Sequence, residues 1–265
     1  MRRFLVSLLR WFPYGDGLLK RVKSVVSPPR NVSSNYVEVQ STLVGAESSR
    51  LRGAWQDDTL PAKQRQLVKG QLVAYRNGAK VDVFDVLVSA LSGLPADDGV
   101  LSVLEVGCSS GYYSEVFSIA GLNVDYTGAD YSPAFVALAR QSYPALTFDI
   151  EDAAALRYAT DSFDVVISGC CLLHIPEYEA AVAETARVAR SYAVFHRTPV
   201  LPDQPNRYFR KLAYDVETVE IHFNEPQFLA LLRSNGLELM RTWTLSEDPP
   251  DNPTSAMRTY LCRVT

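Results

Sequence analysis

The sequence predicts an α/β fold: a doubly wound sheet of five parallel strands that ends in a C-terminal antiparallel hairpin and is preceded by a helical N-terminal cap. Between residues 96 and 195, short β-branched runs alternate with helical patterns, which is typical of a parallel sheet with right-handed crossovers. A glycine-containing turn at 107–111 follows the first strand, as at the carboxyl edge of doubly wound sheets. The last two strand-like runs, 237–245 and 256–264, have no helix between them and therefore form a hairpin.

The N-terminal segment is basic, whereas the rest of the chain is acidic. Residues 1–30 contain seven Lys or Arg and one Asp, a net charge of +6 that leaves −10 on the remainder. Apolar side chains at helical spacing predict a short basic amphipathic helix over residues 2–12. Such a helix either docks on its own protein or a homodimer mate, or makes peripheral contact with an anionic membrane surface. Residues 27–36, rich in Ser, Pro and Asn, indicate a linker.

The next segment predicts a helical cap. Apolar residues recur at helical spacing from Ala54 to Leu91, and Asn77-Gly78 breaks the pattern into two helices. A Gly- and Pro-containing loop at 93–99 then leads into the first strand. The chain is therefore expected to consist of a basic segment and cap at 1–95 and an α/β domain at 96–265.

The elements of the α/β domain follow from caps and periodicity. Ser132 with Pro133 marks the start of one helix, and Asn224 with Gln227 three residues later resembles a capping box that opens another, which Gly236 closes. The long segment 198–223, rich in prolines and aromatic residues, is expected to be an insertion that covers the site. The expected strands are 103–106, 124–129, 146–150, 163–168 and 192–195, and the expected helices are 111–120, the one from Pro133, 177–190 and 224–234.

Composition excludes several classes of function. An acidic body does not offer the clustered cations that a nucleic-acid groove needs. The four cysteines show no Cys-x-x-Cys spacing and no histidines at metal-ligand intervals, so we expect no metal site and a reducing compartment. No apolar run approaches the roughly 18 residues that span a bilayer, and the expected location is the cytoplasm.

Glu105 indicates which cofactor the glycine turn holds. Dinucleotide-binding loops place a pyrophosphate on a Gly-x-Gly-x-x-Gly turn, and a carboxylate beside that group would repel it. Here the turn is Gly107-x-x-x-Gly111, with Ser109 between the glycines. S-adenosylmethionine carries a sulfonium and an ammonium group and no phosphate. The loop therefore favours S-adenosylmethionine over NAD.

Five parallel strands, a closing hairpin, Glu105-x-Gly107 and Asp130 together resemble the class I S-adenosylmethionine-dependent methyltransferase family, whose fold is Rossmann-like. The resemblance covers residues 96–265. The family's loop is typically Glu/Asp-x-Gly-x-Gly-x-Gly, and Ser109 replaces its central glycine here.

The resemblance implies a set of cofactor-binding residues. Gly107 and Gly111 would let the backbone approach the methionine portion, with Ser109 between them, and Glu105 would order that loop and the cofactor's amine. Asp130 would accept hydrogen bonds from both ribose hydroxyls. Alternatively, the glycines mark an ordinary tight turn and Asp130 caps the next helix.

The resemblance also places the adenine and the reacting methyl group. Tyr131 would stack near the adenine, and Asp152 would accept a hydrogen bond from its exocyclic amine. The stretch after the fourth strand would face the methyl group, with Cys170 as a wall of the cofactor site.

Methyl transfer is an in-line displacement that depends mainly on positioning, but a hydroxyl acceptor also needs a base, and histidine has a suitable pKa. His174 resembles the second histidine of the family's Leu-His-His-Ile stretch and is either a base or polar wall, or a histidine satisfied within the core. His196 ends a strand on the same edge of the sheet. The expected acceptor-pocket residues, for which ordinary packing is the alternative, are Trp55, Tyr75, Tyr208, Tyr214 and His222.

These patterns predict an S-adenosylmethionine-dependent methyltransferase of a small molecule, with S-adenosylhomocysteine as the second product. O-methylation of a natural product or of a glycan sugar is the first hypothesis. The alternatives are N- or C-methylation, a non-catalytic S-adenosylmethionine-binding partner protein, and a nicotinamide-dependent dehydrogenase, which Glu105 disfavours.

Overall fold

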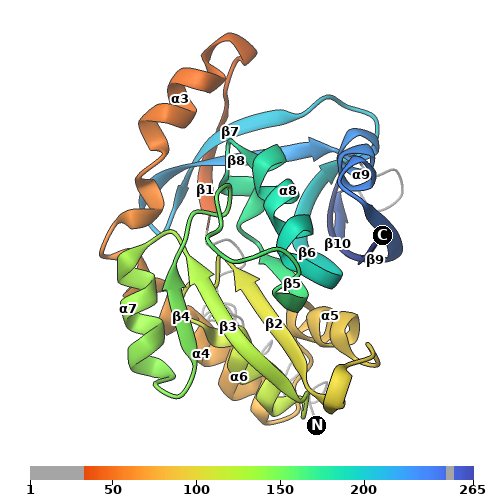
Figure 1. Ribbon diagram of the computed structural model, residues 1–265. Helices are drawn as coiled ribbons and strands as arrows, with labels where there is room; N and C mark the ends of the chain where they lie inside the picture. The colour runs from red at the N-terminus through yellow and green to blue at the C-terminus, as the bar shows by residue number, and fades with distance from the viewer. Residues whose placement is uncertain (1–32, 249–253) are drawn as a thin grey trace, which may run out of the picture.

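A computed structural model describes residues 33–248 and 254–265 (Figure 1). Its main sheet contains the five expected parallel strands in the order β4-β3-β2-β5-β6, and β10 then pairs antiparallel with both β6 and β9. The predicted α/β fold with a terminal hairpin is confirmed. The strands are β2 (Leu101–Val106), β3 (Val124–Asp130), β4 (Thr147–Ile150), β5 (Phe163–Gly169), β6 (Ala189–Leu201), β9 (Leu237–Asp248) and β10 (Ser255–Val264).

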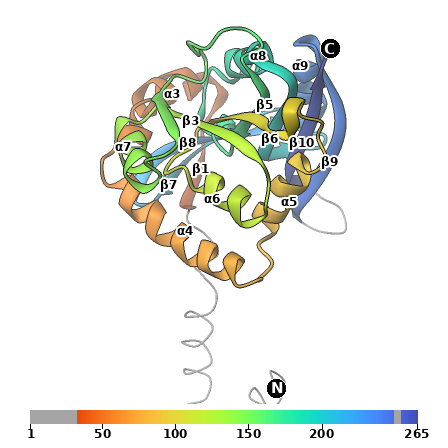
Figure 2. The same cartoon turned by 60° about the horizontal axis from the view of Figure 1, so that its bottom comes forward.

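Helices cover both faces of this sheet (Figure 2). One layer consists of α4 (Leu60–Arg76), α5 (Asp82–Leu91), α6 (Tyr112–Ile119) and α7 (Pro133–Ser142), and the other of α8 (Tyr178–Val188) and α9 (Glu225–Ser234). Successive strand residues face opposite layers, so Val165 joins the first core and Val166 packs on the other face. Both have no exposed surface, which explains why the central strands are continuous apolar runs.

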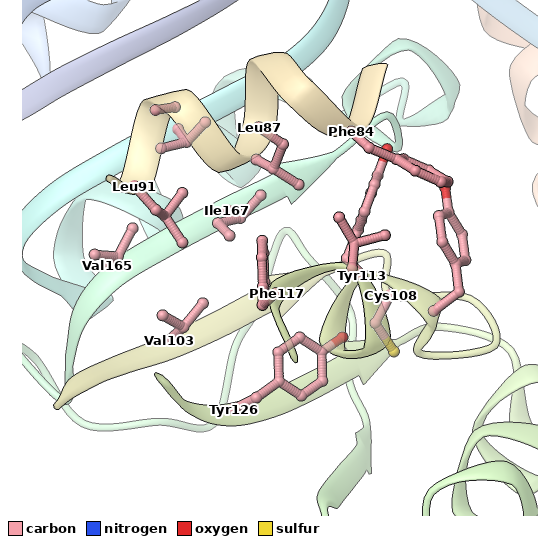
Figure 3. Close-up of a cluster of buried hydrophobic side chains, with 14 of the residues drawn as sticks. Phe84, Leu87, Leu91, Val103, Cys108, Tyr113, Phe117, Tyr126, Val165 and Ile167 are labelled. Atoms are coloured by element: carbon pink, nitrogen blue, oxygen red, sulfur yellow. The ribbon is translucent and has the colours of Figure 1, made fainter. Parts of the chain in front are cut away.

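The larger core lies between α5, α6 and the sheet. Figure 3 shows α5 lying over β2 and β5, with Phe117 of α6 beside them. The aromatic side chains Phe84, Tyr113 and Phe117 continue this cluster toward the carboxyl ends of the strands, and the Phe84 and Tyr113 rings lie 6.0 Å apart. The cap helix α5 is thus an integral part of the core.

The expected insertion forms a second, antiparallel sheet, which we call the lid. It consists of β1 (Ser33–Glu38), β7 (Arg207–Ala213) and β8 (Val216–Asn224), and it lies beyond the carboxyl ends of β2 to β5 (Figure 1). β6 continues past residue 195, and its last residues pair in parallel with β8, which joins the lid to the main sheet. The linker predicted at 27–36 is wrong for residues 33–36, which add a strand to the edge of β7.

The lid is tied to the cap at a two-residue turn. Tyr214 and Asp215 connect β7 to β8 with φ of 52° and 70°, the positive values that a tight hairpin turn needs. The Lys63 side chain on α4 donates to the Tyr214 carbonyl at 2.7 Å and pairs with the Asp215 carboxylate at 3.1 Å. The lid turn is therefore held against α4.

The two cap helices predicted between Ala54 and Leu91 are present as α4 and α5, and the break falls at Asn77 as expected. Before them lie α3 (Val44–Leu51) and the short 3-10 turns η1 (Ser41–Leu43) and η2 (Ala54–Gln56), and later in the chain η3 (Asp97–Gly99) and η4 (Leu172–His174). Of the helices in residues 33–248 and 254–265, none combines the length and apolar character needed to cross a bilayer. The amphipathic helix predicted at 2–12 lies outside the described residues.

Candidate functional site

A pocket of about 970 Å³ opens between the carboxyl ends of the parallel strands and the lid. Its walls come from the glycine turn after β2, the ends of β3, β5 and β6, the cap helix α4 and the lid strands. A cavity of this size can enclose a nucleoside-sized ligand and a second small molecule together.

The glycine turn approaches its neighbours too closely for side chains. A Cβ on Gly107 would lie 2.3 Å from the Cβ of Cys171, and a Cβ on Gly111 would lie 2.6 Å from the Phe148 ring. Both glycines have a φ of +73°. Gly107 lines the pocket, whereas Gly111 begins α6 behind it. The turn thus exposes bare backbone to a ligand.

Asp130 at the end of β3 organises this turn. One carboxylate oxygen accepts the Ser109 backbone N–H at 2.8 Å, and the other accepts that of Ser132 at 2.9 Å. Burial raises the pKa of Asp130 to about 6, against the lowering effect of these two hydrogen bonds. A carboxylate offers about four acceptor positions. Two of them therefore remain for a ligand in the pocket, which Asp130 and Ser109 both line.

Glu105 lies behind the turn and does not line the pocket. Its side chain is 1% exposed, and its carboxyl accepts a hydrogen bond from the Tyr126 hydroxyl at 2.5 Å. Burial raises the pKa of Glu105 well above its ordinary value. The same carboxyl occupies the space that a Cβ on Gly169 would need. Glu105 therefore holds the strand ends together, and a direct contact with a ligand amine is not part of this geometry.

The other expected cofactor residues, Tyr131, Asp152 and Cys170, all line the pocket. The Asp152 carboxylate accepts the Ala154 backbone N–H at 2.9 Å and lies 3.6 Å from the Arg52 guanidinium. Arg52 follows α3, so this contact brings the N-terminal cap over the ligand pocket.

His174 lies in the pocket wall against the lid. Its Nδ1 lies 2.7 Å from the Val219 carbonyl oxygen and donates to it, which leaves the Nε2 lone pair unused. The Trp55 ring lies 4.6 Å from the imidazole. Burial, with a further contribution from Lys211, lowers the pKa of His174 to about 3. The imidazole is therefore neutral and can accept a hydrogen bond at Nε2.

His196 lies outside the pocket. It is 1% exposed, its Nδ1 lies 2.9 Å from the Thr259 hydroxyl, and its ring packs against Tyr113. Strand β6 does not end at residue 195 but continues to Leu201. His196 is consequently an interior residue of the strand, and it has no access to a ligand.

Of the five expected acceptor-pocket residues, Trp55 and Tyr214 line the pocket. Tyr75 packs against Phe84 in the core of the cap, at 5.3 Å between rings. Tyr208 and His222 lie on lid strands away from the pocket. His222 lies two residues from Glu220 on the same face of β8, and its Nε2 lies 2.8 Å from the Glu220 carboxylate.

Sequence reasoning missed three charged residues that line the pocket, Arg197, Lys211 and Glu220. Lys211 and Glu220 form an ion pair between β7 and β8 and are each 5% exposed. The Ser33 hydroxyl of β1 lies 3.0 Å from the Lys211 ammonium. The sequence does contain a lysine and a glutamate that could pair across two neighbouring strands. Recognising this pair requires knowing that the segment forms a hairpin.

Within the part of the chain that the structure describes, no group of three or more His, Cys, Asp or Glu side chains could hold a metal ion. The pocket is therefore described by its hydrogen-bonding groups, its charges and its aromatic walls.

Comparison with known proteins agrees with this geometry. The family model described as a methyltransferase domain matches residues 104–196, which include the glycine turn, Asp130 and His174. A probable S-adenosylmethionine-dependent methyltransferase of Mycolicibacterium smegmatis is 30% identical over 143 residues, or 53% of each chain. These matches show a methyltransferase domain at residues 104–196, and the chain is similar to class I S-adenosylmethionine-dependent methyltransferases.

Solved structures of methyltransferases share this fold. A Methanosarcina mazei S-adenosylmethionine-dependent methyltransferase, 16% identical, aligns with a TM-score of 0.54 over 69% of this chain and 99% of its own. The 1,6-didemethyltoxoflavin-N1-methyltransferase of Burkholderia thailandensis, with 1,6-didemethyltoxoflavin and S-adenosylhomocysteine bound, is 19% identical and has a TM-score of 0.50 over 77% of this chain and 90% of its own. The chain spans about half or less of the length of the curated relatives it matches first.

The pocket beside this methyltransferase domain fits S-adenosylmethionine. Asp130 keeps two acceptor positions beside the exposed glycine turn, which suits a ribose diol. The Trp55 indole N–H and the Gln64 side-chain oxygen are buried at the pocket and have no hydrogen-bond partner among residues 33–248 and 254–265, so a polar ligand can satisfy both. The acidic residues of the pocket outnumber the basic ones, which suits a ligand with a sulfonium and an ammonium group.

Proposed function

We propose that the protein transfers a methyl group from S-adenosylmethionine to an oxygen atom of a small molecule, either a natural product or a sugar of a glycan. The proposal rests chiefly on Asp130, whose carboxylate both orders the glycine turn and faces the pocket with unused acceptor positions. We assign the 96–265 domain to cofactor binding, and the helical cap within the 1–95 segment, together with the lid, to covering the acceptor.

The bound cofactor would supply an electrophilic methyl group, and the residues of the chain provide the geometry. Gly107 and Ser109 present backbone to the methionine portion, Asp130 holds the ribose, and Asp152 with Tyr131 lies at the adenine end. The methyl-bearing end of the cofactor would then lie near Cys170 and His174, which line the same pocket. Holding nucleophile and electrophile in line accounts for a large part of the rate in such displacements.

His174 would orient a hydroxyl acceptor. His174 lines the pocket, and its Nδ1 is fixed by the Val219 carbonyl, so one tautomer is imposed and the lone pair lies on Nε2. Because the pKa of His174 is lowered to about 3, the imidazole stays neutral in any ordinary buffer. We therefore assign it the role of a hydrogen-bond acceptor that aligns the hydroxyl and weakly assists loss of its proton.

The proposed function is tested in two steps with the purified full chain. Calorimetric titrations with S-adenosylmethionine, S-adenosylhomocysteine and NAD should show binding of the first two alone. Transfer of a labelled methyl group to a panel of hydroxyl, amine and activated-carbon acceptors should then give O-methyl products. Binding of NAD without binding of S-adenosylmethionine would contradict the proposal. Products methylated only at N or C would support the alternative chemistries, and binding without any transfer would favour a non-catalytic partner.

Substitutions of His174 can distinguish the roles of its two ring nitrogens. His174→Asn keeps an N–H near the position of Nδ1 and removes Nε2, whereas His174→Gln can still present a polar atom near Nε2. We expect kcat to fall by about 10- to 100-fold in the Asn and Ala variants and by less in the Gln variant. This loss is at the low end of general-base effects because the neutral His174 imidazole is a weak base. The affinity for S-adenosylhomocysteine should not change.

The pH profile provides an independent check on His174. A histidine whose pKa is lowered to about 3 keeps its neutral form at all higher pH, so kcat should show no inflection near pH 6.5 from this residue. An unaltered rate in His174→Ala would remove the residue from the mechanism, and an inflection near pH 6.5 that His174→Asn abolishes would contradict the neutral assignment.

A further inference from the structure

Arg197 is a cation that faces the pocket without an acidic partner. Of the three basic residues that line the pocket, Arg52 lies within 4.0 Å of both Asp152 and Glu177, and Lys211 is paired with Glu220. Among residues 33–248 and 254–265, no carboxylate oxygen lies within 4.0 Å of the Arg197 guanidinium. A half-buried guanidinium is stabilised when a carboxylate or phosphate binds its parallel N–H groups.

The surroundings of Arg197 are neutral hydrogen-bonding groups. The Cys170 thiol lies beside it, with the Tyr113 and Tyr112 hydroxyls, and burial raises the pKa of Tyr113 to about 12. Tyr214 of the lid turn faces the same guanidinium, and burial raises its pKa to about 12 as well. These tyrosines are therefore protonated and able to donate. The Tyr113 side chain is 1% exposed, and its buried hydroxyl does not line the pocket.

A bulge in β6 turns Arg197 toward the pocket. The pairing of β6 with β10 shifts register between Tyr260, opposite Phe195, and Arg258, opposite Thr198. Arg197 lies in this irregularity with a φ of +60°, and its backbone N–H points to the Thr259 hydroxyl at 3.4 Å. Bulges next to active sites commonly redirect one side chain.

Positive φ values near Arg197 occur in residue types that seldom adopt them. Of the non-glycine residues with positive φ in the described segments, those outside the pocket are Asn or Asp, which tolerate this conformation. The four that line the pocket are Ser109, Cys170, Arg197 and Tyr214. One of these is Arg197 itself, and two others, Cys170 and Tyr214, lie beside its guanidinium. Residues held in an unfavourable backbone conformation cluster at binding and catalytic sites.

The position of Arg197 belongs to the acceptor side of the pocket. It follows the part of β6 that pairs with β5, and Cys170, just after β5, donates its backbone N–H to the neighbouring His196 carbonyl at 3.0 Å. Its other neighbour, Tyr214, comes from the lid. The ribose-facing Asp130 ends β3, on the far side of β2 from these strands. A ligand group at Arg197 is therefore most simply part of the second substrate.

The charge balance favours a single negative charge on that group. The pocket is lined by six acidic residues and three basic ones, and two of the basic ones are already paired. One guanidinium with neutral hydroxyl donors matches a monoanion with two coplanar oxygens, whereas a phosphate dianion would bring a second charge that nothing near Arg197 neutralises.

We propose that the methyl acceptor carries a carboxylate group and that Arg197, with the hydroxyl of Tyr214, binds it. This assignment rests on the proposed methyltransferase function and names the substrate class for the same pocket. Arg197 is a specificity-determining residue in this scheme, because an uncharged analogue would leave the guanidinium buried without a partner.

The test uses matched acid and amide probes on the full chain saturated with S-adenosylhomocysteine. Suitable pairs are 4-hydroxybenzoate and its amide, octanoate and its amide, and glucuronate and glucuronamide, with dissociation constants measured by ligand-observed NMR. In at least one pair the acid should bind about tenfold more tightly than the amide, a difference of about 1.4 kcal/mol. Arg197→Gln should abolish this preference, and Arg197→Lys should retain part of it.

Two further variants separate recognition from folding. Arg197→Gly relieves the positive φ and should be as stable as the wild type or more so, yet lose the acid preference. Arg233→Gln, on the exposed surface of α9, is the matched control and should change neither stability nor probe binding.

Several outcomes would overturn the assignment. If no acid binds more tightly than its amide, or if no probe binds at all, the assignment of Arg197 is wrong. Binding of S-adenosylhomocysteine and the proposed function would then still stand. If Arg197→Gln weakens S-adenosylhomocysteine but not 5′-methylthioadenosine, which lacks the amino-acid portion, the residue binds the cofactor's own carboxylate instead. Failure of the wild-type protein to bind S-adenosylhomocysteine would instead remove the proposed function itself.

Discussion

Asp130→Ala should weaken binding of S-adenosylhomocysteine by at least about 100-fold, because two hydrogen bonds to a charged acceptor contribute roughly 1.5–3 kcal/mol each. The substitution removes the acceptor of the ribose hydroxyls and also releases the Ser109 and Ser132 backbone N–H groups that the carboxylate holds at 2.8 and 2.9 Å. The dissociation constant is measured by calorimetry, and the fold is checked by circular dichroism of the apo protein.

A matched control and a modified ligand isolate the ribose contact. Asp125→Ala removes an exposed carboxylate from the same strand and should leave the affinity unchanged. The wild-type preference for S-adenosylhomocysteine over its 2′-deoxy analogue should shrink in Asp130→Ala, since the partner of that hydroxyl is gone. An equal preference in both proteins would show that Asp130 acts on the loop alone.

The raised pKa of Asp130 extends this prediction to pH. Its carboxyl has a pKa of about 6 in the free protein, so the acceptor form is lost as the pH falls through 6. The affinity for S-adenosylhomocysteine should therefore be flat above pH 7 and fall by about tenfold between pH 7 and pH 5. Asp130→Asn cannot titrate, and its weaker affinity should not share this dependence.

The main sheet and the cofactor side of the pocket could be predicted from local signals. Capping residues such as Ser132 and Asn224 mark helix starts, and their side chains do accept from the Phe135 and Gln227 backbone N–H groups. The glycine turn and Asp130 follow strands that are buried on both faces and thus easily recognised. These features depend on residues close together in the chain.

The lid and the acceptor side could not be predicted in the same way. Strands β1 and β7 pair although they lie far apart in the sequence; Arg207 and Glu38, which form a contact between them, are separated by 169 positions. No local sequence pattern specifies such a partner. The turn at Tyr214 lacks the Asn-Gly or Asp-Gly signature of a tight hairpin.

The bulge in β6 explains why the sequence points to His196, whereas the structure brings its neighbour Arg197 to the pocket. A strand that ended at residue 195 would leave His196 free at the edge of the sheet, whereas the actual strand continues and buries it. The bulge then turns the next residue, Arg197, into the pocket. Because successive strand residues face opposite sides, a single irregularity decides which of two neighbours meets the ligand.

Gly107→Ala should be among the most damaging single substitutions in the domain. The added Cβ would lie 2.3 Å from the Cβ of Cys171, and both atoms are fixed to backbone, so neither can rotate away. The conformational strain at a φ of +73° adds about 1–2 kcal/mol. We expect the free energy of unfolding, measured by urea denaturation, to fall by about 3 kcal/mol or more, and binding of S-adenosylhomocysteine to be lost.

Gly121→Ala separates the two causes, because Gly121 has nearly the same φ of +72° but no heavy atom within 4 Å of an added Cβ. It should lose only about 1–2 kcal/mol, so the difference between the variants measures the clash alone. In Gly107→Ala, the second substitution Cys171→Gly removes the opposing Cβ and should recover part of the stability and affinity, although it also removes the thiol contact to the Val106 carbonyl. Equal costs for Gly107→Ala and Gly121→Ala would mean that the turn can move away from Cys171, and the bare backbone at Gly107 would then not be a requirement of the pocket.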